Sequence, residues 1–136
     1  MFSAGISMVG GSGDGGDTTI NQTINQSINT AVIFSGNSNK FKNRYLFFEN
    51  QPSNINGYTV LFPSTISKIN VSVFSLSTGN IIIRKNNIIL TTISLSNETQ
   101  KLIEGLTYPL ILNDKLNIYV ESVIGISYPR VQIYIN

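Results

Sequence analysis

The side chains that carry most enzyme chemistry are scarce in this chain, which contains no histidine and no cysteine. Their absence excludes Ser-His-Asp and Cys-His nucleophiles, disulfides, and metal sites built from imidazole or thiolate. An enzyme of this composition would need a carboxylate pair, a serine–lysine arrangement or a metal bound by carboxylates alone. The carboxylates are Asp14, Asp17, Glu49, Glu98, Glu104, Asp114 and Glu121.

The spacing of these carboxylates predicts structural positions instead of a reacting pair. Asp14 and Asp17 flank two glycines, and so short a run lacks the ligand density of a calcium loop. We expect the Asp114 side chain to cap the turn before the next strand through its own backbone. We expect Glu98 and Glu104 to face solvent. The sequence therefore predicts no catalytic residue, no metal ligand and no cofactor.

Positive charges are few and scattered along the chain. Nine Lys and Arg stand against seven Asp and Glu, which gives a net charge of +2. Only Lys40, Lys42 and Arg44 cluster, and we expect these three on a solvated strand edge, where cations discourage unwanted pairing. No basic stripe indicates a groove for a phosphate backbone, so we expect no nucleic-acid partner.

Hydrophobic segments are short throughout. None approaches the roughly 18 apolar residues that a membrane-spanning helix needs. The first nine residues lack the basic region of a secretory signal, and they run into glycine instead of an apolar stretch. We expect neither a secretory signal nor a membrane partner.

The composition favours β-structure. Charged residues make up 12% of the chain, about half the usual quarter, and Asn, Ser, Thr and Gln supply the remaining polarity. Isoleucine provides most of the apolar mass, and Ile, Thr, Val, Tyr and Phe all favour strands. Asn, Ser and Gly favour turns. We predict an all-β protein with a single β-sandwich domain, jelly-roll-like, over residues 31–136.

The predicted sandwich consists of about eight to ten short strands of about four to nine residues. Asn86 and Asn87 form a turn that accepts positive φ and closes a hairpin. The expected strands are Ala31–Phe34, Arg44–Phe48, Tyr58–Phe62, Ile66–Phe74, Asn80–Lys85, Ile88–Leu95, Gln100–Glu104, Leu106–Leu112, Lys115–Glu121 and Arg130–Ile135.

Residues 1–30 form a separate leader, in which a glycine-rich tail precedes the repeat TINQ-TINQ-SIN at residues 19–29. On a helix or an extended chain, the three isoleucines of this repeat make one apolar seam that a single copy cannot cover. We predict that several copies, most simply three, intertwine to hide this seam. The alternative is a low-complexity tract that stays disordered. The residues of the repeat are Ile20, Asn21, Ile24, Asn25, Ile28 and Asn29.

The tip of the leader is less polar than an ordinary linker, since it contains Phe2, Ile6, Met8 and Val9. One interpretation is a docking tail that orders on a partner protein. The other is a terminus without a role. We therefore treat residues 1–30 as a stalk or anchor and residues 31–136 as the folded domain.

Tyrosine side chains offer a possible ligand surface, because their rings stack on sugars and their hydroxyls accept hydrogen bonds. The candidates are Tyr58, Tyr108 and Tyr128, with the loops Glu49–Gly57 and Ser122–Pro129 around them. Such a surface would bind a host-surface carbohydrate. The alternative is that these tyrosines are half-buried structural residues that close the ends of the sandwich.

The resemblance of this chain to a known family rests on an ordered series of strand and turn segments. These are Tyr45–Phe47, Gly57–Val60, Ser64–Ile69, Ile81–Asn86, Leu90–Ile93, Leu110–Leu116, Tyr119–Ser122 and Arg130–Ile135. The series resembles a small β-sandwich domain of tailed-bacteriophage virion proteins, including fibre-like and capsid-associated ones. Asn87 and Asn113 replace glycines of the family pattern, and asparagine is the natural substitute at positive φ.

This resemblance implies a non-enzymatic structural protein of a phage virion, made in the host cytoplasm and located in the particle. Together with the leader, it implies a homotrimeric, capsid-attached head fibre or decoration protein that binds a capsid or other virion protein through the leader. The alternative is a tail-fibre or adhesin module that binds a host-surface carbohydrate or receptor.

Overall fold

The computed structural model describes residues 30–136. Every regular element in this part of the chain is a β-strand, which confirms the predicted all-β class. No helix of these residues is long and apolar enough to cross a membrane. The strands are β1 (Thr30–Ser35), β2 (Arg44–Tyr45), β3 (Phe47–Phe48), β4 (Gln51–Pro52), β5 (Tyr58–Thr59), β6 (Ser64–Lys85), β7 (Ile88–Ile103), β8 (Tyr108–Leu110), β9 (Lys115–Glu121) and β10 (Arg130–Ile135).

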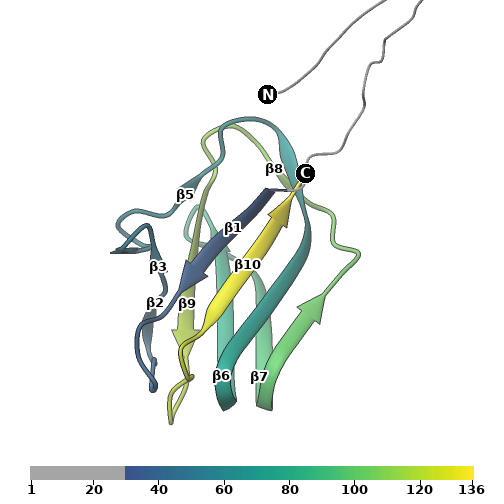
Figure 1. The fold of residues 1–136 in the computed structure, drawn as a ribbon. Helices are drawn as coiled ribbons and strands as arrows, with labels where there is room; N and C mark the ends of the chain where they lie inside the picture. Colours follow the sequence, from purple (N-terminus) through teal and green to yellow (C-terminus); the bar gives the residue numbers. More distant parts are fainter. Residues whose placement is uncertain (1–29) are drawn as a thin grey trace, which may run out of the picture.

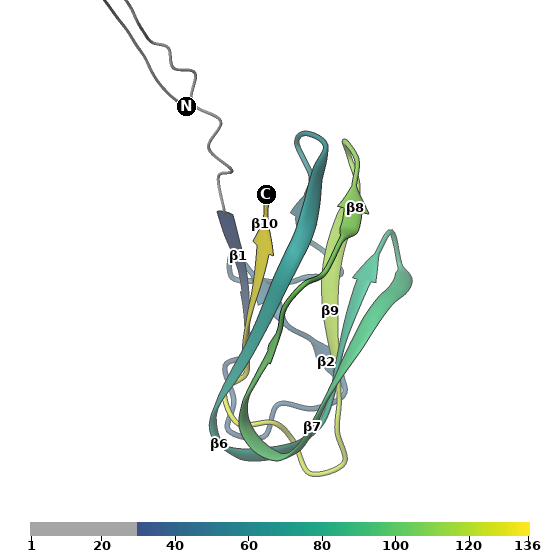
Figure 2. The ribbon, with the colours of Figure 1, turned by 90° about the vertical axis from the view of Figure 1, so that its right-hand side faces the viewer.

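These strands form one antiparallel sheet in the order β2-β9-β6-β10-β1-β3-β4, with β5 added to β9 and with β7 and β8 added to β6. In Figure 1, β1, β10 and the first part of β6 run side by side, and β9 passes behind them. Figure 2 shows the β6–β7 hairpin curving from one side of the molecule to the other. The sheet therefore curls around its interior into a nearly closed, barrel-like shape.

β6 joins the two sides because its two ends pair with different strands. Its first part pairs with β10 from Ile66 to Ser72, and its last part pairs with β9 from Asn80 to Lys85. The 22 residues of β6 and the 16 of β7 contradict the prediction of four separate short strands in this region. Register shifts between these parts let the pair bend without leaving the ladder.

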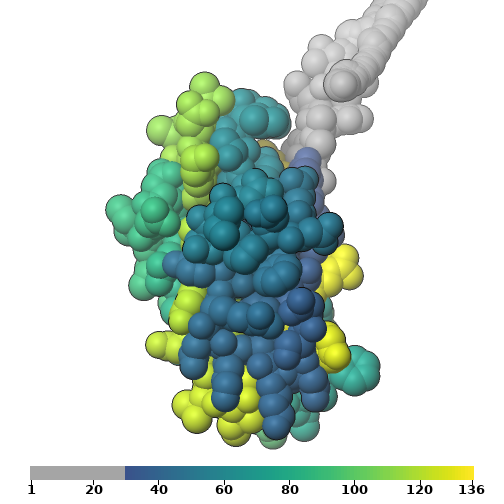
Figure 3. All heavy atoms as spheres, turned by 90° about the vertical axis from the view of Figure 1, so that its left-hand side faces the viewer, coloured from purple at the N-terminus to yellow at the C-terminus, as the bar shows by residue number. Residues whose placement is uncertain are grey.

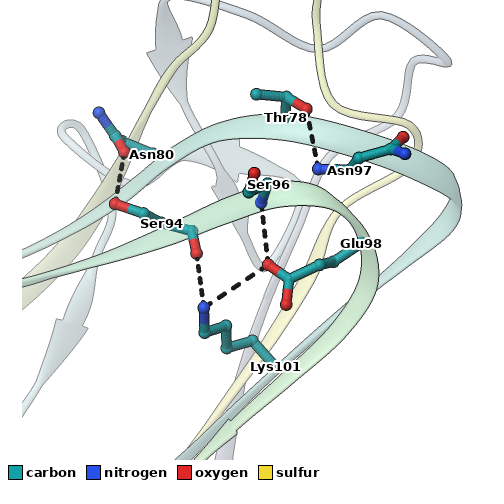
Figure 4. Close-up of polar contacts among 7 residues, drawn as sticks. All are labelled: Thr78, Asn80, Ser94, Ser96, Asn97, Glu98 and Lys101. Atoms are coloured by element: carbon teal, nitrogen blue, oxygen red, sulfur yellow. Dashed lines mark hydrogen bonds and ion pairs between the residues drawn. The ribbon is translucent and has the colours of Figure 1, made fainter.

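Side chains hold the bent part of the hairpin, as Figure 4 shows. Thr78 Oγ1 accepts a hydrogen bond of 2.9 Å from the backbone N–H of Asn97, whose φ is 55°. Glu98 Oε1 accepts one of 2.8 Å from the N–H of Ser96, and this bond lowers the pKa of the Glu98 carboxyl. Lys101 Nζ lies 3.5 Å from the same carboxylate. Glu98 thus accepts a hydrogen bond from the backbone of its own strand, and its side chain is also partly exposed to solvent.

Other predicted strands are shorter in the structure. The expected strand Arg44–Phe48 is divided into β2 and β3 at Leu46, which is fully buried and donates its N–H to the Ile118 carbonyl. The strand expected at Tyr58–Phe62 ends after Thr59, and Leu106–Leu112 contracts to β8. The predicted bounds of β9 and β10 are confirmed.

Aliphatic side chains fill the interior of the sheet. The segment that carries β2 to β5, which is blue to teal in Figure 3, covers one side of it. Full burial of one such side chain stabilises the fold by about 1.5 to 3 kcal/mol. The largest fully buried residues are Phe34, Phe41, Leu46, Ile66, Ile69, Ile81, Ile83, Leu110, Leu116, Ile118, Ile126 and Ile133. Isoleucine dominates this set, as expected where β-branched side chains pack on a pleated surface.

Asparagine occupies the tight turns at positive φ, as predicted. The φ angles are 54° at Asn86 and 66° at Asn87, which suit a two-residue hairpin turn between β6 and β7. Asn113, in the turn between β8 and β9, has a φ of 73°. Asn87 and Asn113 therefore adopt the positive φ that these two turns require.

Candidate functional site

Asp114, the most buried carboxylate of the described chain, has a structural role. Its Oδ2 accepts a hydrogen bond of 2.8 Å from the N–H of Ile111, and its Oδ1 accepts one of 2.8 Å from Asn86 Nδ2. Asn86 Oδ1 in turn accepts the N–H of Lys115 at 2.9 Å. The bond from Ile111, followed by that from Asn86, lowers the pKa of the carboxyl. Asp114 therefore caps the β8–β9 turn, as predicted, and also ties it to the β6–β7 turn.

The lowered pKa of Asp114 predicts that stability depends on pH. A carboxylate whose folded-state pKa lies below its ordinary value stabilises the fold above that value, and the contribution is lost as pH falls through the folded-state pKa. We expect Asp114→Asn to lower the urea midpoint at about pH 6 but to differ little from the unmodified protein at about pH 2. Glu104→Gln, a change at an exposed carboxylate, is the matched control. An equal loss for Asp114→Asn at both pH values would contradict the prediction.

The remaining carboxylates do not converge. Glu121 Oε1 accepts a hydrogen bond of 3.0 Å from Asn80 Nδ2, and Glu49 and Glu104 are exposed. Within residues 30–136, no three His, Cys, Asp or Glu side chains lie close enough together to bind a metal ion.

The structure places the three candidate tyrosines apart. Tyr58, on β5, is half-buried and meets the Phe48 ring edge-on at a centroid distance of 6.0 Å. Tyr108, on β8, is half-buried, packs against the core and pairs with Ile66 of β6. Tyr128 lies in the β9–β10 loop, and its side chain is 49% exposed. Only Tyr128 presents much of its ring to solvent.

Tyr128 forms an exposed pair with Phe74, a residue that the sequence did not single out. Phe74 is 79% exposed, and the two rings meet edge-on at 6.1 Å. Tyr128 has a φ of 43°, an uncommon backbone conformation for an aromatic residue. Hydrogen bonds hold it there, because its N–H donates to the Ser38 carbonyl and the N–H of Phe74 donates to the Ser127 carbonyl, both at 2.9 Å. We call Phe74 and Tyr128 the distal aromatic pair.

The distal aromatic pair lies at the end of the domain opposite to Thr30. Along β1, Thr30 pairs with Ile135 and Ser35 pairs with Arg130, so the chain runs from one end of the sheet to the other. Figure 1 shows the start of β1 at the top of the molecule and the β9–β10 loop at the bottom. Tyr128, two residues before Arg130, therefore lies far from the point where residues 1–29 join the domain.

Large apolar side chains are exposed at the end where residues 1–29 join. We call Leu61, Phe62, Ile111 and Leu112, each between 55% and 69% exposed, the proximal apolar patch. The two segments lie side by side because Val60 exchanges backbone hydrogen bonds of 2.8 Å with Asn113 and Asp114, and Ser64 pairs with Leu110. Exposed apolar groups gathered in this way mark interaction surfaces.

A polar hollow of about 290 Å³ opens between the loop after β4, the β6–β7 turn and the start of β9. The predicted ligand loop Glu49–Gly57 supplies half of its lining. Thr59 follows this loop directly, and the other contributors were not predicted, because they come from strands and turns far away in the sequence. We call this space the amide hollow, and its lining residues are Ser53, Asn54, Ile55, Asn56, Gly57, Thr59, Asn86, Asn87, Lys115 and Asn117.

The predicted anchoring residues lie outside the described part of the chain. They are Phe2, Ile6, Met8, Val9, Ile20, Asn21, Ile24, Asn25, Ile28 and Asn29. No protein-family model matches the sequence, and no curated protein is similar enough to count as a relative.

Proposed function

We propose that this protein is a non-enzymatic structural protein of a phage virion, a trimeric, capsid-attached head fibre or decoration protein. The observation that carries the proposal is that the two ends of the domain differ. The leader joins at Thr30, next to the proximal apolar patch, whereas the β9–β10 loop lies at the opposite end. A domain held by its leader would turn that loop away from the particle. The resemblance to phage virion domains supports the same role.

The proximal apolar patch supports an assembly centred on the leader. Three leaders that hide Ile20, Ile24 and Ile28 from water would bring three domains together at the end where Thr30 lies. Neighbouring copies would then cover residues such as Phe62. In this proposal each copy is one jelly-roll-like sandwich on an extended or coiled oligomerising leader.

The tip of the leader has a separate task in this proposal. Phe2, Ile6, Met8 and Val9 dock on a capsid or other virion protein, so that the stalk is fixed at its far end. The protein is made in the host cytoplasm, joins the particle there, and uses no cofactor, nucleic acid or membrane.

Removal of residues 1–29 tests this proposal. We expect the shortened chain to keep the unfolding free energy of the full chain within about 0.5 kcal/mol, because its core is intact. It should sediment as a monomer, whereas the full chain sediments as a trimer, and it should not join particles assembled without a full-length copy. A shortened chain that joins particles normally would contradict the proposal.

Two sets of substitutions test whether assembly depends on the isoleucine seam or only on the length of the leader. Ile20→Ser, Ile24→Ser and Ile28→Ser made together should give a monomer, because the seam loses its apolar groups. Gln22→Ser with Gln26→Ser, in the same repeat, is the matched control and should remain trimeric. Equal sedimentation of the two variants would rule out the seam as the cause of assembly.

A second candidate function is adhesion to a host-surface carbohydrate or receptor, and the distal aromatic pair favours it. Exposed aromatic rings stack on the apolar faces of sugars, and this pair lies where an anchored domain would meet a cell. Phe74→Ser should then weaken binding to host cells by about tenfold. Unchanged cell binding by that variant would remove the pair from consideration.

A further inference from the structure

The amide hollow combines polar groups that the fold uses with polar groups that it leaves available. The side-chain amide of Asn86 makes two hydrogen bonds, because its Nδ2 donates to Asp114 and its Oδ1 accepts from the N–H of Lys115. Asn117 Nδ2 donates to Asn87 Oδ1 at 3.2 Å. The second set makes no side-chain hydrogen bond within residues 30–136. It consists of Asn54, Asn56, Thr59, the Nδ2 of Asn87 and the Nζ of Lys115.

The loop that forms one wall of the hollow is held rigidly. The N–H groups of Ile55 and Asn56 donate to the Pro52 carbonyl at 2.9 and 3.1 Å. Ser53 Oγ accepts the N–H of Ile118 on β9 at 3.1 Å, so the loop is fixed to the strand beneath it. A Cβ at Gly57 would collide with the Leu116 carbonyl oxygen, so only glycine allows this close approach. The backbone of this wall is therefore held in place, so a ligand need not order the loop when it binds.

The opposite wall is equally fixed. Asn117 is buried, with a relative exposure of 6%, and its bond to Asn87 Oδ1 leaves the Nδ2 of Asn87 as a donor for a ligand. The positive φ of Asn87 is that of a tight hairpin turn. Two walls from distant parts of the chain thus present amides to one space.

The chemistry of the available groups defines the ligand. Amides and a hydroxyl match a molecule with several hydroxyl groups, and Ile55, which is 70% exposed at the rim, can contact its C–H groups. Lys115 is the one cation among the lining residues, and it favours a ligand with a negative charge. A volume of about 290 Å³ is at the lower limit of small-molecule sites, which suits one ring.

We propose that the amide hollow binds one acidic sugar residue of a glycan, with its carboxylate on Lys115 and its hydroxyls on the amides of Asn54, Asn56 and Asn87. This proposal does not rest on the virion role. It also differs from adhesion through the distal aromatic pair, because it places the sugar at another end of the domain.

The experiment is an NMR titration of the full-length protein with methyl glucuronide and, separately, with the neutral methyl glucoside. We expect the side-chain amide signals of Asn54 and Asn87 to shift with methyl glucuronide, and the neutral sugar to bind about tenfold more weakly. Absence of these shifts, or equal binding of the two sugars, would overturn the proposal. Displacement of the glucuronide by an equal concentration of inorganic phosphate would also overturn it, since the hollow would then be a general anion site.

Variants that keep the backbone conformation test whether a loss of sugar binding comes from the site itself and not from unfolding. Asn87→Gly keeps the positive φ of the turn and removes the amide, so the protein should stay folded and bind methyl glucuronide about tenfold more weakly. Lys115→Gln should bind the two sugars equally. Glu104→Gln, at an exposed carboxylate that does not line the hollow, is the control and should bind normally. Loss of binding in Phe74→Ser but not in Asn87→Gly would move the sugar to the distal aromatic pair.

The virion role is judged by different measurements. Asn87→Gly should join particles as the full chain does, because the leader and the proximal apolar patch are unchanged. Failure of sugar binding in a protein that still assembles would refute the sugar site alone. Failure of the leader deletion test, with sugar binding intact, would refute the virion role alone.

Discussion

Replacement of Phe34 by alanine is expected to lower the free energy of unfolding by about 3 to 5 kcal/mol. Phe34 lies on β1, is fully buried, and its ring centroid is 5.3 Å from that of Phe48 on β3. Its removal takes a large apolar surface out of the core and leaves a cavity that the surrounding sheet fills only in part. Urea unfolding monitored by circular dichroism measures the difference.

Ile33→Ala is the matched control, because Ile33 is the neighbouring residue on the same strand and is 40% exposed. Successive side chains of a strand point to opposite faces, so this change opens no cavity in the core. We expect it to cost about 1 kcal/mol or less. If Phe34→Ala cost as little as Ile33→Ala, then β1 would not be part of the core, and the folded domain would begin after it.

The strands whose bounds were predicted correctly are those in which local signals decide the structure. β9 and β10 alternate apolar and polar residues between turns, and β10 buries Val131, Ile133 and Ile135 on one face. A strand of this kind is specified by its own sequence, because one face must be buried and the turn residues end it. No distant contact is needed to place such a strand.

The long β6–β7 hairpin was not predictable from the same signals. Ser75, Thr78 and Gly79 have the composition of a turn, and they divide an otherwise strand-like sequence into two. In the structure the chain stays in the ladder there, because Thr78 and Glu98 satisfy backbone N–H groups at the bend. The contact between Thr78 and Asn97 joins residues 19 positions apart, and a local pattern does not contain it.

The candidate sites also contain some residues that the local sequence predicts and others that it does not. The loop Glu49–Gly57 and the exposed Tyr128 could be selected from the sequence, because turn residues place them at the surface. The other half of the amide hollow could not, since Lys115 meets the loop through the pairing of β5 with β9, and Asn87 meets it through the pairing of β6 with β9. Phe74 was assigned to an alternating strand, on the same face as Asn70 and Ser72, so its exposure follows from that alternation, whereas its contact with Tyr128 does not.

Gly125→Ala is expected to lower the free energy of unfolding by about 3 to 5 kcal/mol, because the backbone conformation and the packing both oppose a side chain there. Gly125 lies in the β9–β10 loop with a φ of 115°, which disfavours any other residue. A Cβ there would also lie 2.7 Å from the Cα of Lys40, a backbone atom that cannot rotate away. Its neighbour Ile126 exchanges backbone hydrogen bonds with Phe41, and both are fully buried.

Gly105→Ala separates the two causes, because Gly105 also has a positive φ, 72°, but a Cβ there would meet nothing within 4 Å. In that variant only the backbone conformation is strained, so its free energy of unfolding should fall by about 1 kcal/mol. The excess loss in Gly125→Ala then measures the displacement of Lys40 and of the Phe41–Ile126 bridge behind it. Thermal unfolding of both variants in one buffer gives this difference. Equal losses would show that the loop moves away from Lys40 freely, and that its packing does not hold the distal end of the domain in place.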